Sequence, residues 1–199
     1  MKKRPYRMRQ RAESEQQTRL RITESAVALH GTLGPSRTSI WAIAEHASVR
    51  RSTVYRHFPD EAALFGACST HWMTANPLPE LARWAAVEDA DARLRMALRE
   101  LYAFYRRTER MMVNILRDEE TMPIVKETMG GYRRYLAAAR EALMAGRRLK
   151  KPAQCRVRAA IGHALAFHTW RSLALEQGLD DAAGADLMYV WVAGTSRVR

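Results

Sequence analysis

The residues of this sequence that are best suited to chemistry are polar side chains crowded between positions 50 and 57. They are Arg50, Arg51, Ser52, Thr53, Tyr55, Arg56 and His57. An arginine can bind the O6 and N7 atoms of guanine together, and a threonine methyl group can pack against thymine. Tyrosine, serine and histidine commonly donate hydrogen bonds to phosphate. This composition therefore favours binding to double-stranded DNA.

The surrounding residues predict two short helices that would position this row. The first begins after Thr38, a good N-cap, and has four apolar positions for burial. These are Ile40, Ile43, Ala44 and Ala47. A turn at Ser48–Val49 leads into the second helix, which ends at His57. In a helix-turn-helix the second helix lies in the major groove while the first crosses the backbone. Backbone amides at the Thr38 helix start can also hold a phosphate.

Helical periodicity continues on both sides of this pair. A preceding helix over residues 13–32 has an apolar stripe, and Pro35 prevents its continuation. The stripe is Ile22, Ala26, Leu29 and Leu33. A following helix capped by Asp60 runs to about Thr74, and the prolines at 77 and 79 then mark a boundary.

The rest of the chain predicts further helices and no strand ladder. Their expected ranges are 80–107, 109–120, a helix following Pro123, 153–177 and 183–197. The fold class is therefore all-α, with a small N-terminal helix-turn-helix domain and a larger C-terminal helical bundle. We expect a basic flexible arm over residues 1–12, a DNA-binding domain over 13–75, and a helical domain over 76–199.

The net charge of +12 is unevenly distributed, because half of it lies in the first 21 residues. A basic arm of this kind suits a phosphate backbone or an anionic membrane surface, and a solubilising tail is the alternative. Cys68 and Cys155 are too few for a disulfide framework, which favours free thiols in a reducing cytoplasm. No signal peptide and no membrane-spanning stretch is evident, so we expect a cytoplasmic protein without a membrane partner.

The segment from about residue 14 to 75 resembles the DNA-binding domain of the TetR/AcrR family of transcriptional regulators. The matching residues are Thr38, Ser39, Ile40, Ile43, Ala44, Ala47, Val49, Ser52 to Pro59, and Asp60. The resemblance implies DNA contacts by Thr38, Ser39, Arg50, Arg51, Ser52, Thr53, Tyr55 and His57. Two positions depart from the family: Glu61 stands where a phosphate-binding lysine is common, and Ser48 where the turn commonly has glycine. Trp41 is also unusual on a helix face that is normally polar.

The same resemblance implies a homodimer on a palindromic operator, released by a small-molecule effector, and usually a repressor. Candidate effector-pocket residues are aromatic, Met and His side chains, for which ordinary core packing is the alternative. They are Tyr102, Tyr105, Met112, Met129, Phe167 and His168. Candidate dimer-interface residues, on the last two helices, are Ile161, Leu165, Leu187, Val190 and Trp191.

Two other classes of function were weighed against this one. An enzyme would need a phosphate-binding glycine loop, a GxSxG nucleophile or a paired metal motif, and the sequence has none. Cys68 and His71, three residues apart, lack a second pair, so packing is expected and no metal or cofactor is predicted. A non-specific architectural DNA-binding protein would need the charge, but neither a shaped recognition helix nor a large C-terminal domain.

Overall fold

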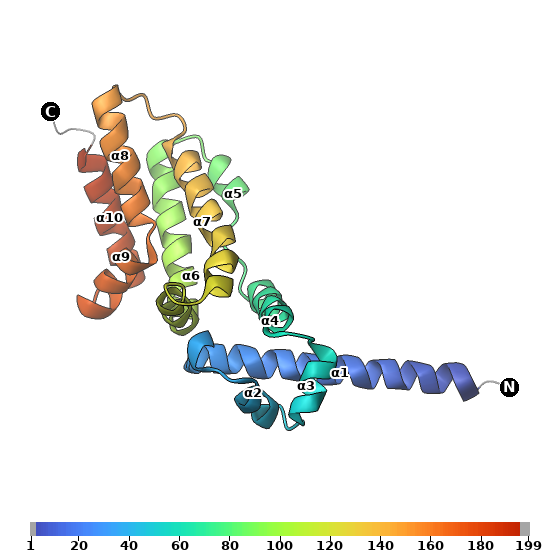
Figure 1. The fold of residues 1–199 in the computed structure, drawn as a ribbon. Coiled ribbons are helices and arrows are strands. Elements are labelled where there is room, and N and C mark those ends of the chain that lie inside the picture. Colours follow the sequence, from blue (N-terminus) through green and yellow to red (C-terminus); the bar gives the residue numbers. More distant parts are fainter. Residues whose placement is uncertain (1–2, 196–199) are drawn as a thin grey trace. The chain divides into compact units, whose positions relative to one another are not determined.

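The computed structural model describes the backbone of residues 3–195 and the side chains of residues 8–195. All regular elements in these ranges are helical, and no strand occurs among them, as the all-α prediction requires (Figure 1). By contacts the chain divides into two compact units. Unit 1 comprises the residues up to Asn76 together with 110–128, and unit 2 comprises 77–109 together with the residues from Met129 onward.

Unit 1 is built from four helices and the ends of two longer ones. They are α1 (Lys3–Thr32), α2 (Ile40–His46), α3 (Arg51–His57), α4 (Glu61–Ala75), the last part of α6 (Ala90–Asp118) and the first part of α7 (Pro123–Met144). A 3-10 turn, Pro35–Arg37, joins α1 to α2. Helix α1 packs against α2, α3 and α4.

The core of unit 1 consists of small and medium apolar side chains, as the spacing predicted. Its buried members are Ile22, Ala26, Ile43, Ala44, Ala47, Val54, Phe58, Leu64 and Cys68. Leu29 is half-buried, but Leu33 is exposed, so the predicted stripe of α1 ends one turn early. The reason is local: Thr32 is the last residue of α1, and Leu33 lies in the turn that follows.

Helix α1 begins at Lys3, ten residues earlier than expected. Residues 3–12 therefore continue the helix and are not the irregular arm that their polar composition suggested, while Met1 and Lys2 lie outside the described residues. Figure 1 shows these first turns extending beyond the other helices of unit 1. Arg9 and Glu13, one turn apart, form an ion pair at 3.0 Å that supports this helical extension.

The caps of two short helices explain where they begin. Ser39, and not Thr38 as predicted, is the N-cap of α2, because its hydroxyl accepts a hydrogen bond from the amide of Ala42 at 3.1 Å. Thr38 instead donates its hydroxyl to the carbonyl of Gly34 at 2.7 Å. Asp60 caps α4 as predicted and accepts from the amide of Ala63 at 2.7 Å.

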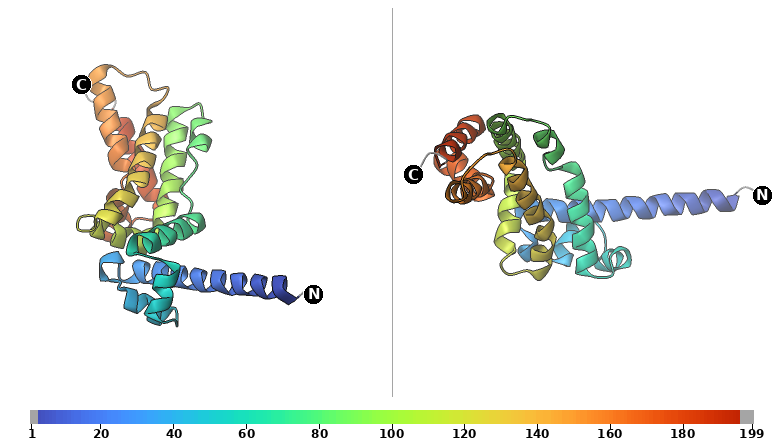
Figure 2. Two further views of the ribbon diagram at one scale, coloured as in Figure 1. Left: turned by 45° about the vertical axis from the view of Figure 1, so that its right-hand side comes forward. Right: turned by 90° about the horizontal axis from the view of Figure 1, so that it is seen from above.

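Unit 2 contains the first part of α6, most of α7, and four further helical segments. These are α5 (Leu81–Ala85), α8 (Lys151–Ala164), α9 (Phe167–Arg171) with a π-helical turn at Ser172–Glu176, and α10 (Asp181–Thr195). Helices α8 and α10 lie side by side (Figure 2). No helix of the described chain is both long enough and apolar enough to cross a membrane.

Three helix boundaries in the C-terminal part differ from the prediction. The helix expected over 80–107 is interrupted at 86–89, where the Asp89 carboxylate accepts from the amides of Asp91 and Ala92 and starts α6. The break expected near residue 108 is absent, because the Thr108 hydroxyl bonds the Phe104 carbonyl within a continuous α6. The helix expected over 153–177 stops at Ala164.

Candidate nucleic-acid interface

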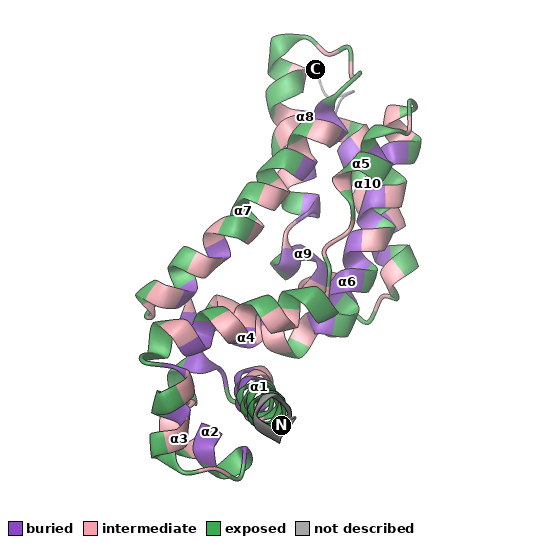
Figure 3. Ribbon diagram, turned by 90° about the vertical axis from the view of Figure 1, so that its right-hand side faces the viewer, coloured by how far each residue is buried: buried purple, intermediate pink, exposed green. Residues whose placement is uncertain are grey.

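Helix α3 is held to unit 1 by one fully buried side chain and presents most of the others to solvent. Val54 is the buried residue, and Phe58 just after the helix is buried too. Arg51, Ser52, Tyr55 and Arg56 are exposed, as Figure 3 shows by colour for the helix as a whole. Arg50, which precedes the helix, is also exposed, and Thr53 is half-buried. The structure thus brings Arg50, Arg51, Ser52 and Tyr55 together on one short element, as predicted.

The turn between α2 and α3 places Ser48 in the left-handed region, with φ of 53°. Ser48 is the one non-glycine residue with positive φ in the described chain. The amides of Ser48 and Val49 bond the carbonyls of Glu45 and Ala44 at 3.0 and 2.9 Å, which fixes the angle between the two helices. Glycine adopts this conformation without a steric cost, so the sequence departure at Ser48 falls where glycine would be easiest.

Arg19 of α1 holds the carboxyl end of α3, a role that sequence reasoning missed. Its Nη1 atom donates to the carbonyl of His57 at 2.5 Å, and its guanidinium lies 4.1 Å from the centre of the Phe58 ring. A cation at the carboxyl end of a helix also complements the helix dipole. The available signal was the position of Arg19, three residues before the buried Ile22, on the side of α1 that faces α3.

Three of the residues predicted to contact DNA are engaged in local structure. The hydroxyl hydrogen of Thr38 is donated to Gly34, whereas the Ser39 oxygen accepts the cap hydrogen bond and keeps its own O–H as a donor. The His57 Nε2 atom is shielded from solvent and has no hydrogen-bond partner within the described residues. Burial, followed by the charges of Arg56 and Arg19, lowers the pKa of His57. A neutral, shielded ring is a poor phosphate ligand.

Trp41 lies on the outside of α2 with 60 % of its surface exposed. The neighbouring Ile43 and Ala44 face the core, so the indole points away from it. Glu61, the other departure, is exposed in the first turn of α4. The surface around α2 and α3 therefore carries one large aromatic side chain besides Tyr55, and an acidic group where a lysine would favour phosphate.

A family model for bacterial regulatory proteins of the TetR family matches residues 22–68 of the chain. Those residues run from the buried Ile22 of α1 through the helix-turn-helix to Cys68 of α4. Residues 22–68 form a TetR-family N-terminal domain. The resemblance seen in the sequence is thereby confirmed.

Solved structures extend the similarity to the fold of the C-terminal part. A TetR-like transcriptional regulator from Rhodococcus sp. RHA1 is 18% identical, with a TM-score of 0.65 over 88% of this chain and 93% of that one. A Clostridium perfringens protein assigned as a fatty acid metabolism regulator has a TM-score of 0.67 at 12% identity, covering 90% and 100% of the two chains. The fatty acid degradation regulator FadR from Bacillus halodurans has a TM-score of 0.58 at 15% identity, covering 92% and 97%. No curated protein sequence matches the chain.

The candidate effector residues that follow the TetR-family domain are mostly packed together inside unit 2. Tyr102, Tyr105 and Phe167 are buried, and the Tyr105 ring lies 5.3 Å from Phe167 and 6.4 Å from Tyr102. Met129 is buried in the same unit, whereas Met112 is buried in unit 1. His168 is exposed, so its assignment to a buried pocket is wrong.

Hydrogen bonds connect this aromatic cluster to the break between α8 and α9. The Tyr102 and Tyr105 hydroxyls donate to the carbonyls of Ala164 and Leu165 at 3.0 and 2.7 Å. The half-buried Tyr132 hydroxyl lies 2.7 Å from that of Tyr105, to which it must donate because the Tyr105 hydrogen is already used. Burial raises the pKa of Tyr132 to about 12, so the chain of hydroxyls is neutral at physiological pH.

The candidate dimer residues fall into two groups. Leu187, Val190 and Trp191 are exposed on α10. Ile161 and Leu165 are fully buried within the protomer, and their assignment to an interface is therefore corrected. Helix periodicity alone could not separate the face of α8 that packs inside one protomer from a face available to a second copy.

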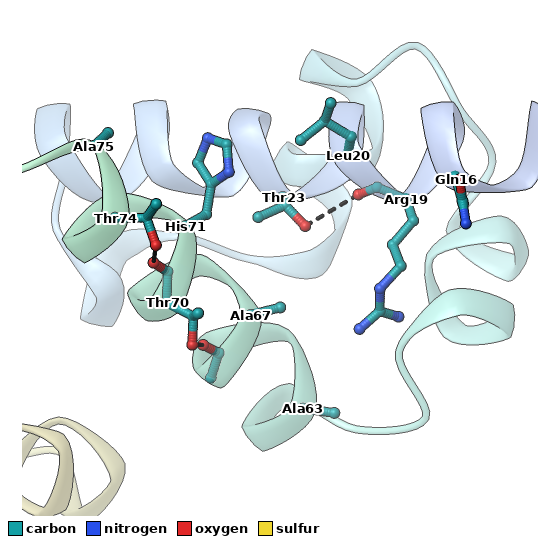
Figure 4. A pocket seen from close by; sticks show the side chains of 11 residues that line it. Gln16, Arg19, Leu20, Thr23, Ala63, Ala67, Thr70, His71, Thr74 and Ala75 are labelled. Carbon is teal, nitrogen blue, oxygen red and sulfur yellow. Dashed lines mark hydrogen bonds between the residues drawn. The ribbon is translucent and has the colours of Figure 1, made fainter. Parts of the chain in front are cut away.

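A groove of about 710 Å³ lies between α1 and α4 of unit 1 (Figure 4). Small side chains form much of its α4 wall, among them Ala63, Ala67 and Thr70, and Leu20 and Thr23 of α1 face them. Cys68 is buried behind this wall, and burial raises the pKa of its thiol to about 12. The groove contains none of the residues predicted to bind an effector.

Proposed function

We propose that this chain is a sequence-specific, DNA-binding transcriptional regulator, with DNA binding assigned to residues 13–75 and the helical extension of residues 1–12 as an additional basic contact. The observation that carries the proposal is the α3 surface. One buried valine anchors the helix, while Arg51, Ser52 and Tyr55 are exposed beside Arg50. Such a helix is shaped to enter the major groove, and its arginines suit guanine.

The same proposal assigns dimer formation and effector binding to residues 76–199. A single helix-turn-helix makes few base contacts, so two copies on a palindromic operator are needed for useful specificity. The exposed Leu187, Val190 and Trp191 of α10 give a second copy an apolar surface to cover. A protein of this kind acts in the cytoplasm, where bacterial DNA lies.

Regulation is proposed to be repression, relieved by a small molecule bound in the C-terminal domain. The half-buried Tyr132 is the exposed end of the hydroxyl chain that reaches Tyr105 and the α8–α9 break. A ligand that accepts or donates at this end would compete with those hydrogen bonds. It can shift the protein between two states only by its difference in affinity for them.

The test is selection of binding sites from a random DNA library by the full-length protein. We expect a palindromic consensus, and ten- to hundredfold weaker binding to it when Arg51 or Tyr55 is changed to Ala, about 1–3 kcal/mol per contact. Arg83→Ala, an exposed arginine of unit 2, is the control and should bind as the unaltered protein does. Enrichment of no sequence would favour the architectural alternative, and a folded Arg51→Ala variant with unaltered affinity would contradict the assignment of α3.

A further inference from the structure

A second concentration of positive charge lies outside the helix-turn-helix, between residues 133 and 158. This segment holds nine basic residues against the single acidic Glu141, a net charge of +8. The nine are Arg133, Arg134, Arg140, Arg147, Arg148, Lys150, Lys151, Arg156 and Arg158. Its charge exceeds that of the first 21 residues, which the proposed function uses. The whole segment belongs to unit 2.

The fold gathers this segment into one continuous region, here called the 133–158 basic surface. It comprises the second half of α7, the connection from Ala145 to Lys150, and the first half of α8 (Figures 1 and 2). Arg158 of α8 forms an ion pair with Glu141 of α7, and the Arg140 side chain lies against Gly162 of α8. Charges from the two helices are therefore neighbours in space as well as in sequence.

Few negative groups compensate this surface. Glu141 is shared by Arg158 and Arg140, and Arg147 is used internally, since it pairs with Asp91 at 3.0 Å and donates to the Leu143 and Ala90 carbonyls. Arg134, Arg148, Lys150 and Lys151 are exposed, and no ion pair or hydrogen bond of their side chains occurs among the described residues. The first turn of α8 also lacks an acidic residue. Cations at the amino end of a helix are unfavourable, so a bound anion would relieve an existing repulsion.

The composition of the surface selects the class of partner. None of the large hydrophobic residues exposed in the described chain falls between 133 and 158. A protein interface needs an apolar centre, and stable attachment to a membrane needs apolar side chains or a lipid. A nucleic-acid backbone needs neither, because its binding is driven by counterion release. Seven of the nine cations are arginine, whose planar fork matches phosphate.

We propose that the 133–158 basic surface binds the phosphate backbone of double-stranded DNA without sequence preference, as a contact additional to that of α3. The choice of DNA as the polyanion rests on the proposed function. The arrangement supplies affinity, and leaves discrimination between sequences to the helix-turn-helix. Removing charge from it should therefore weaken binding to operator and random DNA by the same factor.

The experiment compares the unaltered full-length protein with the triple variant Arg148→Gln, Lys150→Gln, Lys151→Gln. The matched control is Arg83→Gln, Arg99→Gln, Arg107→Gln, which removes the same charge from exposed positions of unit 2 outside the surface. Affinity for a random-sequence duplex and for the selected operator is measured by fluorescence anisotropy across a salt series. We expect the first variant to bind both duplexes more than about tenfold more weakly near 0.1 M salt, with a salt slope smaller by about 2–3. The control should change neither quantity by more than a small factor.

The outcomes separate this proposal from the proposed function. Selective operator binding by the unaltered protein, together with equal salt slopes in both triple variants, would overturn the surface and leave the α3 assignment standing. Binding to neither duplex by the unaltered protein would overturn both. Vesicles containing phosphatidylglycerol and a polyglutamate peptide serve as alternative anions. If the first triple variant loses affinity for either of them but not for DNA, the surface belongs to that class of partner and the proposal is wrong.

Discussion

The helix-turn-helix and the aromatic cluster of unit 2 use their polar groups in opposite ways. In α3 one side chain is buried and the polar ones are directed outward. In the cluster, Tyr102 and Tyr105 are buried and give their hydroxyl hydrogens to backbone carbonyls of the same protomer. Outward polar groups on a packed helix need an external partner, so their chemistry indicates that partner. Inward groups are satisfied already, and a core and a ligand pocket can have the same residues.

The largest predicted effect would break the aromatic cluster. Trp170 is fully buried, its ring lies 5.8 Å from that of Tyr105, and its Nε1 donates to Asp181 at 2.9 Å. We expect Trp170→Ala to destabilise unit 2 by about 3–5 kcal/mol. Hydrogen exchange should accelerate in α8, α9 and α10 while α2 and α3 stay protected. Trp41→Ala is the matched control, because an exposed tryptophan should alter stability by only about 0.5 kcal/mol. Equal losses in the two variants would contradict the burial that distinguishes them.

The second effect concerns the helix-turn-helix side of the comparison and is a pH dependence. His30 is buried beside Phe65, and burial lowers its pKa to about 4, although the charge of Asp118 opposes the shift. The unfolded chain, with a histidine pKa near 6.5, therefore binds a proton that the folded chain does not. Stability should be complete above about pH 6.5 and decline by up to about 3 kcal/mol as the pH falls to about 4.

Denaturant midpoints of unit 1 measured from pH 7.5 to 4 test this dependence. His30→Gln should flatten the decline, whereas His168→Gln, which changes an exposed histidine of unit 2, should leave it in place. Asp118 is separable, because burial would raise its pKa but hydrogen bonds from Arg117 and Ser36 lower it overall, and its contribution is lost at lower pH. An unaltered slope in His30→Gln would show that another group titrates.

A third prediction sharpens the comparison by separating binding from packing on a single surface. Trp41 is exposed on α2, the helix that crosses the backbone in this motif. We expect Trp41→Ala to weaken operator binding about three- to tenfold, equivalent to about 0.6–1.4 kcal/mol, through lost contact with sugar and phosphate. Anisotropy with the selected operator measures the loss, and circular dichroism should show an unaltered fold. Trp41→Phe should recover part of the affinity, and failure to do so would indicate a steric role.

The sequence predicted the parts of the molecule that depend on neighbours in the chain. Asp60 caps α4 and the turn at Ser48 leads into α3 because both are set within a few residues. Ile161 and Leu165 were misplaced, since only tertiary packing decides which side of an apolar helix faces its own core. The charge between 133 and 158 was visible, but its meaning depended on knowing which side chains are paired and that no large apolar group is exposed among them.

The smallest predicted effect concerns Ser48, where the turn required by α3 meets a residue with a Cβ atom. A left-handed conformation costs such a residue about 1–2 kcal/mol, and glycine offsets part of the gain by its larger freedom when unfolded. Ser48→Gly should therefore stabilise unit 1 by about 0.5–1 kcal/mol, measured by chemical denaturation. Ser52→Gly, inside α3, should destabilise it by a similar amount, because helical φ values give glycine no advantage. If both variants lose stability, the exposed Ser48 makes an interaction that outweighs its strain, and the departure from glycine is itself favourable to the fold.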